Sequence, residues 1–369
     1  MRRLYALGTC VALGASACAT QQAGTHPAGL VQRPVGAVDT DADALFEQAR
    51  AATQDDDTTR AEALYLEVIA MRAEDPLAPL ARYNLGLLYE RRSAWTDAVT
   101  QYAAIVALRP EVPGRRRDTW RDAHYRLAAC AAKVGDWSTA GGTLLAVLDE
   151  PDLEDVDRLE AMVGAGVALS ESGSDEAARL MLGDAVRFVR TRQREGRFED
   201  RGFGAEAAFR LAELANADYA VATLTMPEAQ LAPLLEEKCR RLLVAQQHYV
   251  EAIAMGDAHT AAAAGFRVGA LYETLYEALA ALAPPGDLDD EQTSVYRDLV
   301  AERLGVLLHK ARHVYTRALA VGSQASTAAP WLDRLRLALD RLEALASSLP
   351  GQHGQSTAGV LTPAARIAQ

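Results

Sequence analysis

The stretch that decides the fold runs from Pro79 to Pro110 and reads PLARYNLGLLYERRSAWTDAVTQYAAIVALRP. Apolar residues recur in both halves at i, i+3 and i+4, the period of an amphipathic helix. Proline has no backbone N–H, so Pro110 is expected to end the second helix. The stretch therefore predicts two helices packed as a hairpin. The residues that stand out in this stretch are Leu85, Gly86, Tyr89, Ala98 and Tyr102.

The spacing of these residues resembles the tetratricopeptide repeat (TPR), a helix–turn–helix unit of about 34 residues. The resemblance implies that the small residues lie where the two helices cross most closely. Leu85 and Tyr89 are then expected to fill the groove between the helices, and Tyr102 to pack between neighbouring repeats. The pattern departs from the family at Arg82, where an aromatic residue is usual, and at Ile105, where a small residue is usual.

Similar units with weaker motifs precede and follow this stretch, and no segment shows the alternation of a strand. Gly269 and Tyr272 begin the last unit. The second helices of the two last units share an Ala-x-x-x-Tyr-x-x-Ala spacing, at Ala245, Tyr249 and Ala252 and at Ala311, Tyr315 and Ala318. We therefore expect an all-α solenoid of about six TPR-like hairpins over residues 41–347, wound as a right-handed superhelix with a concave groove. A terminal helix from Trp331 to Leu345 is expected to cap it.

The N-terminal end has the pattern of a secretory signal. A basic pair at residues 2–3 precedes an apolar run from Leu4 to Leu13, and small residues then lead to Cys18. The apolar run is too short to span a bilayer, which needs about 20 apolar residues. A cysteine after small residues resembles a bacterial lipobox. The resemblance implies that residues 1–17 are removed and that Cys18 is acylated.

The lipobox resemblance also bears on location. Ala19 stands where inner-membrane retention usually needs aspartate, so the resemblance implies a lipid anchor in the outer membrane, with the domain facing the periplasm. Ala15 stands where leucine is usual, so an ordinary signal peptide and a soluble periplasmic protein remain the alternative. Residues 18–40 are expected to be a flexible tether and residues 348–369 a disordered tail.

Composition limits the partners. The chain has 38 basic and 50 acidic residues, a formal net charge of −12, which argues against nucleic acid. Two basic clusters, Arg115–Arg117 and Thr191–Arg197, are expected in loops, either solvated or touching an acidic partner. Cys130 and Cys239 lie far apart within helical patterns and are expected to be free thiols rather than a disulfide.

No catalytic or phosphate-binding motif occurs in the sequence, so we expect no enzyme activity, no cofactor and no metal. His309 and His313 have the i, i+4 spacing of zinc ligands on a helix. Lys310 stands where the zincin pattern needs glutamate, so the two histidines are expected to be ordinary surface residues.

The part of the chain from Ala261 to Leu345 resembles repeat lipoproteins of gliding, myxobacteria-like bacteria. The resemblance implies a component of the envelope machinery for adventurous gliding motility. The expected function is a non-enzymatic scaffold that holds envelope proteins or peptides in its concave groove, with outer-membrane assembly and polysaccharide export as rival pathways. A groove-based ligand-binding protein or envelope enzyme, and a simple spacer, are the alternatives. Three tryptophans are expected to be packing residues or, alternatively, peptide anchors: Trp95, Trp137 and Trp331.

Overall fold

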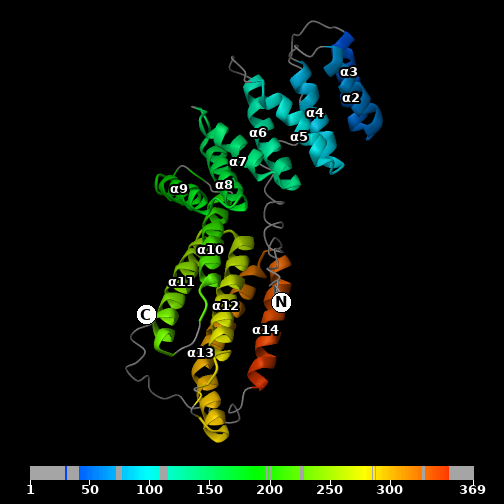
Figure 1. The fold of residues 1–369 in the computed structure, drawn as a ribbon. Coiled ribbons are helices and arrows are strands. Elements are labelled where there is room, and N and C mark those ends of the chain that lie inside the picture. The colour runs from blue at the N-terminus through cyan, green and yellow to red at the C-terminus, as the bar shows by residue number, and fades with distance from the viewer. Residues whose placement is uncertain are drawn as a thin grey trace, which may run out of the picture. The chain divides into compact units, whose positions relative to one another are not determined.

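The computed structural model describes residues 30, 41–71, 77–108, 115–150, 152–196, 198, 202–224, 228–284, 286, 288–325 and 329–348. These residues form 13 helices and no strand, which confirms the all-α prediction (Figure 1). Cys18 and Pro110 lie outside the described residues, as do the predicted signal peptide and nearly all of the tether and tail. The predicted boundaries of those segments stay predictions.

The chain divides by contacts into two compact units, Met1–Glu199 and Asp200–Gln369, where the sequence prediction had one repeat domain. The helices of the first unit are α2 (Asp41–Gln54), α3 (Thr58–Met71), α4 (Leu77–Arg91), α5 (Trp95–Val106), α6 (Arg115–Val134), α7 (Trp137–Leu148), α8 (Asp155–Glu171) and α9 (Asp175–Arg194). Those of the second unit are α10 (Phe203–Val221), α11 (Glu228–Ala254), α12 (Ala258–Ala280), α13 (Asp290–Gly322) and α14 (Ala329–Ser348).

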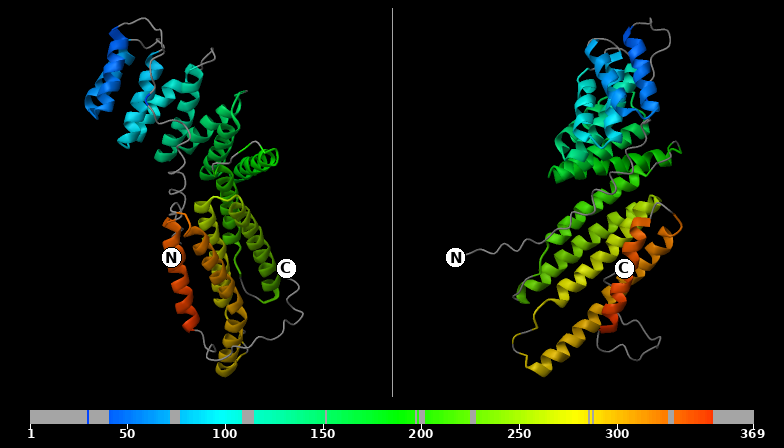
Figure 2. Two further views of the ribbon diagram at one scale, coloured as in Figure 1. Left: turned by 180° about the vertical axis from the view of Figure 1, so that it is seen from behind. Right: turned by 90° about the vertical axis from the view of Figure 1, so that its right-hand side faces the viewer.

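The helices of the first unit form four consecutive hairpins, α2/α3 to α8/α9. Each helix packs chiefly against the helix before it and the helix after it, as Figure 2 shows for this unit. That pattern is typical of a repeat array, in which each unit covers its apolar face only with its neighbours. The second unit adds two longer hairpins, α10/α11 and α12/α13, and the single helix α14.

One buried pair recurs in the second helix of all six hairpins. A small alanine is followed four residues later by a large side chain, so both lie on the same helix face. All of these side chains are buried, with at most 6% of their surface exposed. The pairs are Ala61 and Tyr65, Ala98 and Tyr102, Ala140 and Leu144, Ala178 and Leu182, Ala245 and Tyr249, and Ala311 and Tyr315.

The turns inside the first four hairpins are also alike. In each turn, the residue two places before the second helix has a positive φ. The next residue donates its N–H to the carbonyl five residues earlier, for example Ala94 N to Tyr89 O at 2.9 Å and Asp136 N to Ala131 O at 2.9 Å. This is the Schellman ending of a helix. The four left-handed residues are Asp56, Ser93, Gly135 and Gly173.

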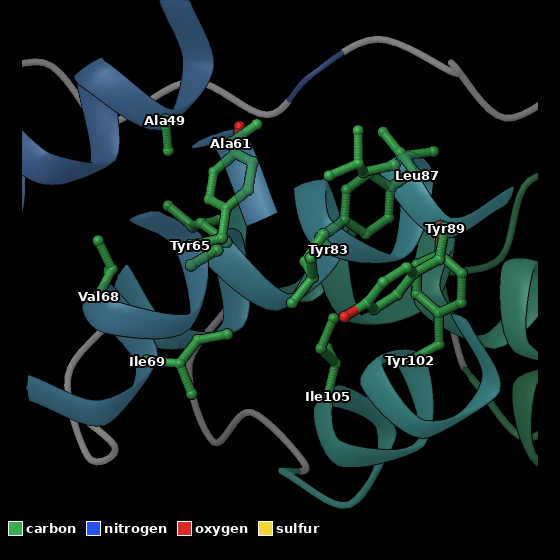
Figure 3. Close-up of a cluster of buried hydrophobic side chains, with 14 of the residues drawn as sticks. Ala49, Ala61, Tyr65, Val68, Ile69, Tyr83, Leu87, Tyr89, Tyr102 and Ile105 are labelled. Atoms are coloured by element: carbon green, nitrogen blue, oxygen red, sulfur yellow. The ribbon is translucent and has the colours of Figure 1, made fainter. Parts of the chain in front are cut away.

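The apolar side chains of α2 to α5 and part of α6 make one continuous cluster, called here the first core cluster (Figure 3). It contains buried residues from Ala42 to Cys130, with Tyr65, Tyr83 and Tyr102 among its largest fully buried members. Burial of so much apolar surface is the main stabilising contribution to these hairpins.

In the second unit, α14 covers the last hairpin, at α12 and α13. Trp331 is buried there, with its ring centre 5.7 Å from that of Phe266, and its indole N–H donates to His259 Nε2 at 3.3 Å. The helix α14 thus occupies the place of the predicted cap and extends it slightly at both ends.

The predicted loop position is wrong for the first basic cluster and for the start of the second. Arg115 begins α6, so the first cluster forms the first turn of a helix, where Asp118 complements the dipole. The second cluster starts inside α9, whose last turn contains Arg192 and Arg194. Cations are favourable at a helix C-terminus, because the exposed carbonyls there carry partial negative charge.

Candidate functional site

Buried polar clusters are the most chemically elaborate feature of the described residues. In the first cluster, the Tyr102 hydroxyl donates to Glu90 Oε1 at 2.6 Å. Arg126 Nη1 donates to Glu90 Oε2 at 3.0 Å, and both Tyr102 and Arg126 are buried. The three residues come from α5, α4 and α6. The cluster therefore joins one hairpin to the first helix of the next.

Two further clusters in the second unit repeat this arrangement. The members of each cluster come from three successive helices. Their members are Tyr249, Glu213 and Arg267, and Tyr315, Glu273 and Arg341. Arg267 Nη2 lies 2.7 Å from Glu213 Oε2, and Arg341 Nη2 lies 2.6 Å from Glu273 Oε2. Each tyrosine again donates to the glutamate, which accepts from both neighbours.

A glycine four residues before the glutamate completes two of the clusters. A Cβ atom on Gly86 would lie 2.6 Å from Tyr102 Cζ, too close for any side chain. A Cβ on Gly269 would likewise collide with the ring of Tyr315. The tyrosine ring therefore lies directly on the backbone of the first helix. In the remaining cluster, Phe209 stands at that position and its ring packs 5.7 Å from that of Tyr249.

The electrostatics of the clusters keep the phenols protonated. Burial, together with the adjacent glutamate, raises the pKa of Tyr102 and Tyr315 far above the ordinary value for tyrosine. Burial and Glu213 do the same for Tyr249. A phenol with such a pKa is a hydrogen-bond donor and not a nucleophile or base at neutral pH. The clusters therefore act as structural joints between hairpins.

The structure adds a contact to the role predicted for Tyr102. Its ring lies on Gly86 of its own hairpin, where only glycine leaves enough space. The next repeat is reached through the hydroxyl, by way of Glu90 and Arg126.

Tyr89 also makes a contact with the preceding hairpin that was not predicted. The side chain is buried between helices, as expected, and its hydroxyl donates to Glu62 of the preceding hairpin at 3.0 Å. Burial and Glu62 raise the pKa of Tyr89 to about 12. Glu62 also pairs with Arg92 at 2.5 Å. Tyr89 thus links its own hairpin to the one before it.

The other residues predicted to pack the repeats lie at helix contacts. Tyr272 is half-buried, and its hydroxyl donates to Gln246 of α11 at 2.9 Å. A Cβ on Gly265 would collide with Ala318, so α12 and α13 approach closely there. Six more of the predicted residues are also buried, namely Leu85, Ala98, Ala245, Ala252, Ala311 and Ala318.

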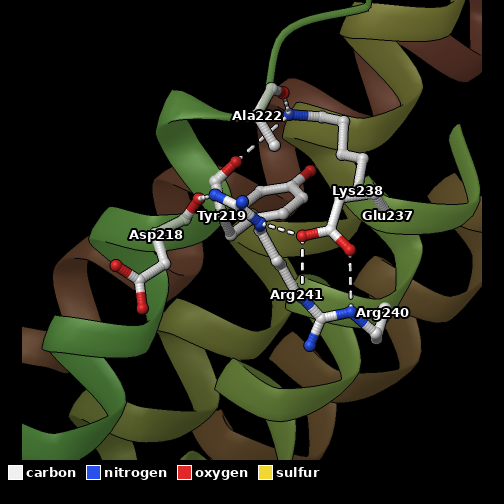
Figure 4. Close-up of polar contacts among 7 residues, drawn as sticks. All are labelled: Asp218, Tyr219, Ala222, Glu237, Lys238, Arg240 and Arg241. Atoms are coloured by element: carbon white, nitrogen blue, oxygen red, sulfur yellow. Dashed lines mark hydrogen bonds and ion pairs between the residues drawn. The ribbon is translucent and has the colours of Figure 1, made fainter. Parts of the chain in front are cut away.

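Lys238 of α11 is a buried cation that sequence reasoning missed. Its Nζ donates to Ala222 O at 2.7 Å and lies 4.2 Å from the ring centre of Tyr219 (Figure 4). Arg241 donates to Asp218 O at 2.8 Å. These carbonyls belong to the negative end of α10, so both cations cap that helix. Burial lowers the pKa of Lys238, but its Nζ is engaged by the carbonyls and is not free to attack a substrate.

Metal chemistry finds no support in the described part of the chain. No group of three or more His, Cys, Asp or Glu side chains there is arranged to hold a metal ion. His309 and His313 are both exposed on α13. Cys130 is buried and Cys239 half-buried, and both are free thiols.

All three tryptophans pack against buried residues. Trp95 packs against the first core cluster, and Trp137 packs against a second cluster of buried residues from α6, α7 and α8. Trp331 is 5% exposed.

The sequence signal for the polar clusters was only partly visible. The tyrosines stood out by their spacing, whereas their carboxylate and guanidinium partners come from other helices at variable distances along the chain. One local signal exists, because Glu90 follows Gly86 by four residues, as Glu273 follows Gly269. The residues missed are Glu90, Arg126, Glu213, Arg267, Glu273 and Arg341.

Comparison with known proteins gives little beyond the fold. No protein-family model and no curated protein matches the chain. Similar solved structures include the apo form of RapI, with a TM-score of 0.44, 9% identity, and coverage of 84% of this chain and 99% of that one. A tetratricopeptide repeat protein from Parabacteroides merdae has a TM-score of 0.37 and 12% identity, and the match covers 80% of this chain and 98% of that one.

A third similar structure is a Podosopora anserina protein with nearly identical TPR-like repeats. It has a TM-score of 0.36 and 19% identity, and the match covers 54% of this chain and 93% of that one. Likenesses this weak carry no argument, so the description of the fold rests on the helix packing set out above. Among the described helices, none has the length and apolar character needed to cross a membrane.

Proposed function

We propose that this protein is a non-enzymatic scaffold for protein–protein interaction. The observation that carries the proposal is the run of hairpins α2/α3 to α8/α9, in which each helix packs chiefly on its sequence neighbours. The successive hairpins of such a stack together offer an extended surface for a partner. The buried polar cluster at Glu90 holds successive hairpins in one register, and a preorganised surface loses little entropy on binding.

The scaffold is proposed to be anchored in the cell envelope through an acylated Cys18. Support comes from the sequence alone, namely the basic start, the short apolar run and the small residues before Cys18. Acyl chains on one cysteine anchor stably, because each buried CH2 contributes about 0.8 kcal/mol. The outer membrane is the proposed location. The proposed setting is a multiprotein envelope machine, with gliding motility as the first pathway to examine and outer-membrane assembly or polysaccharide export as the rivals.

The anchor is tested by metabolic labelling with a radioactive fatty acid in a bacterial host. The full chain is compared with Cys18→Ala and with Cys10→Ala, a matched control whose cysteine lies inside the predicted signal. We expect label and membrane retention in the unmodified chain and in Cys10→Ala, and neither in Cys18→Ala. Equal labelling of Cys18→Ala would remove the anchor from the proposal.

The scaffold role is tested by affinity capture from crosslinked membranes. The unmodified chain is expected to retain a defined set of envelope proteins, and Cys18→Ala to retain them much less. Those proteins then identify the pathway. If neither chain retains any partner above an unrelated lipoprotein, the scaffold proposal is wrong.

A further inference from the structure

The first half of α13 contains no side chain that is buried within the chain. Residues 290–307 are exposed or half-buried, and the buried residues of this helix begin only at Leu308. The helix α13 has 33 residues against 23 in α12, the helix on which it chiefly packs (Figure 1). Helices in proteins owe most of their stability to the packing of an apolar face. The first half of α13 therefore has a face that another chain can cover.

Three large apolar side chains lie on that face. Val295, Leu299 and Val306, called here the exposed stripe, each have 54–56% of their surface exposed. At about 100° per residue they lie within about 40° of one another around the helix, whereas the buried Ala311 and Tyr315 lie on the opposite side. Single exposed apolar residues are common, but an aligned stripe of them is typical of an interaction surface.

The spacing of the exposed stripe is that of a coiled coil. Together with Glu302, its three residues are separated by four, three and four positions, the alternation that keeps a seam facing a partner helix. A polar residue at one position of such a seam fixes the register at a cost in affinity. The spacing therefore predicts a weak association with another long helix.

The charges of α13 identify that partner helix. From Asp290 to Glu302 it has four acidic residues and one basic residue, a net charge of −3. From Arg303 to Gly322 it has four basic residues and no acidic residue, a net charge of +4 with histidine neutral. The exposed acids of the first half are Asp290, Glu291, Asp298 and Glu302, and the exposed bases of the second half are Arg303, Lys310, Arg312 and Arg317. Two antiparallel copies of α13 are therefore complementary in charge.

The helix dipole does not account for this division of charge. Its effect falls off within about the first and the last turn of a helix. Asp290 and Glu291 lie in the first turn, but Asp298 and Glu302 lie beyond the second, and the last turn contains no basic residue. The division therefore calls for a partner outside the helix.

We propose that the exposed stripe of α13 is a self-association surface, to which a second copy of this chain binds in antiparallel orientation. A two-fold axis between Glu302 and Arg303 places the acidic half of each helix beside the basic half of the other. The same axis brings Leu299 of one copy near Val306 of the other. A parallel arrangement would place like charges together, which disfavours it. This inference goes beyond the proposed scaffold function and does not depend on it.

Sedimentation velocity over a range of chain concentrations tests the association. All chains are full-length and carry Cys18→Ala, so that no acyl group contributes. This starting chain is expected to pass from monomer to dimer as its concentration rises. Leu299→Gln, which interrupts the exposed stripe without changing charge, is expected to weaken the dimer at least tenfold. Leu180→Gln is the matched control, because Leu180 is a similarly exposed leucine on α9.

Charge reversal tests the antiparallel pairing. Asp298→Lys combined with Glu302→Lys makes both halves of α13 basic, and Arg312→Glu combined with Arg317→Glu removes the net positive charge of the second half. Each double variant alone is expected to dimerise at least tenfold more weakly than the starting chain, because the attraction between the halves is lost. An equimolar mixture of the two is expected to form a heterodimer, since one helix is then basic and the other acidic.

A third double variant controls for net charge. Glu67→Lys combined with Glu176→Lys reverses two exposed acids of the first unit and is expected to leave the association unchanged. Circular dichroism checks that every variant keeps its helix content.

A starting chain that stays monomeric at every concentration overturns the proposal. So does a dimer that Leu299→Gln and both charge reversals leave intact, because it would use another surface. A mixture of the two charge-reversed chains that remains monomeric overturns the antiparallel pairing. The scaffold proposal is judged separately, by capture of envelope proteins, and a monomeric chain that captures its partners keeps that role.

Discussion

At the scale of single residues, the contact between Gly86 and Tyr102 sets the spacing of a hairpin. The ring is fully buried, and its hydroxyl is fixed by Glu90, so it has no direction in which to retreat. The same reasoning applies to Gly269 and Tyr315. Protein interiors are packed so closely that one added methyl group changes the free energy of unfolding.

Gly86→Ala is therefore expected to destabilise the protein by about 1–3 kcal/mol, as overpacked cores do. Gly142→Ala is the matched control, because a Cβ there meets nothing within 4 Å and alanine favours a helix by up to about 1 kcal/mol. Urea unfolding followed by circular dichroism measures both. Equal effects of the two substitutions would contradict the close contact.

The hydrogen bond from Tyr102 to Glu90 gives a second prediction at this scale. Tyr102→Phe removes the donor and leaves a partly buried carboxylate with one partner fewer, so we expect a loss of about 1–3 kcal/mol. Glu90→Gln should cost less in the Tyr102→Phe background than in the unmodified chain. A double-mutant cycle that gives no coupling energy would show that the bond does not stabilise the fold.

His124 predicts a dependence on pH. Burial lowers the pKa of His124 below its ordinary value of about 6.5, and its Nδ1 donates to Trp120 O at 2.8 Å. The unfolded chain therefore binds a proton at this residue more readily than the folded chain does. This contribution to the free energy of unfolding is complete above pH about 6.5 and is lost as the pH falls below it.

We expect His124→Gln to reduce the loss of stability between pH 7 and pH 5, as measured by urea unfolding at each pH. His313→Gln is the control, since His313 is exposed on α13 and its replacement should leave the pH profile unchanged. An unaltered profile for His124→Gln would assign the pH dependence to other groups.

At the scale of helices and turns, the four Schellman turns of the first unit have different residues at the same left-handed position. Gly135 accepts a positive φ without cost, whereas Ser93 at φ 57° does so at a cost of about 1–2 kcal/mol. Ser93→Gly is expected to stabilise the protein by up to about 1 kcal/mol, and Gly135→Ala to destabilise it by about 1–2 kcal/mol. Thermal and urea unfolding measure the change in the free energy of unfolding for both variants. The prediction fails unless the two changes have opposite signs.

The sequence predicted the helices well because their signals are local. The Ala-x-x-x-Tyr spacing of α5, α11 and α13 lies within one helix, and the structure buries each of those pairs. The six hairpins and the terminal helix follow from that period. Helix ends have weaker signals, as the start of α6 at Arg115 shows, because a basic run is compatible with either a loop or the first turn of a helix.

The polar clusters were not predicted, because their members meet only through tertiary packing. Glu90 and Arg126 lie 36 residues apart and Glu273 and Arg341 lie 68 apart, so no local pattern links them. The division at Glu199 likewise depends on contacts between helices.

At the scale of the whole molecule, the two compact units predict two separable unfolding events. Each unit has its own buried clusters and its own glycine–tyrosine contact, at Gly86 in the first and Gly269 in the second. Cooperativity in repeat proteins passes between neighbouring units, so it weakens where contacts are fewest. A perturbation in one unit should therefore leave the other largely unaffected.

Gly86→Ala is expected to increase amide exchange in α4 to α6 and to leave α12 to α14 unchanged, while Gly269→Ala should do the reverse. Hydrogen exchange measured peptide by peptide in the full chain, at increasing urea, separates the two responses. If either substitution lowers protection equally in both units, the chain unfolds as one cooperative block. In that case the division at Glu199 would describe the density of contacts along the chain and not the units in which it loses its structure.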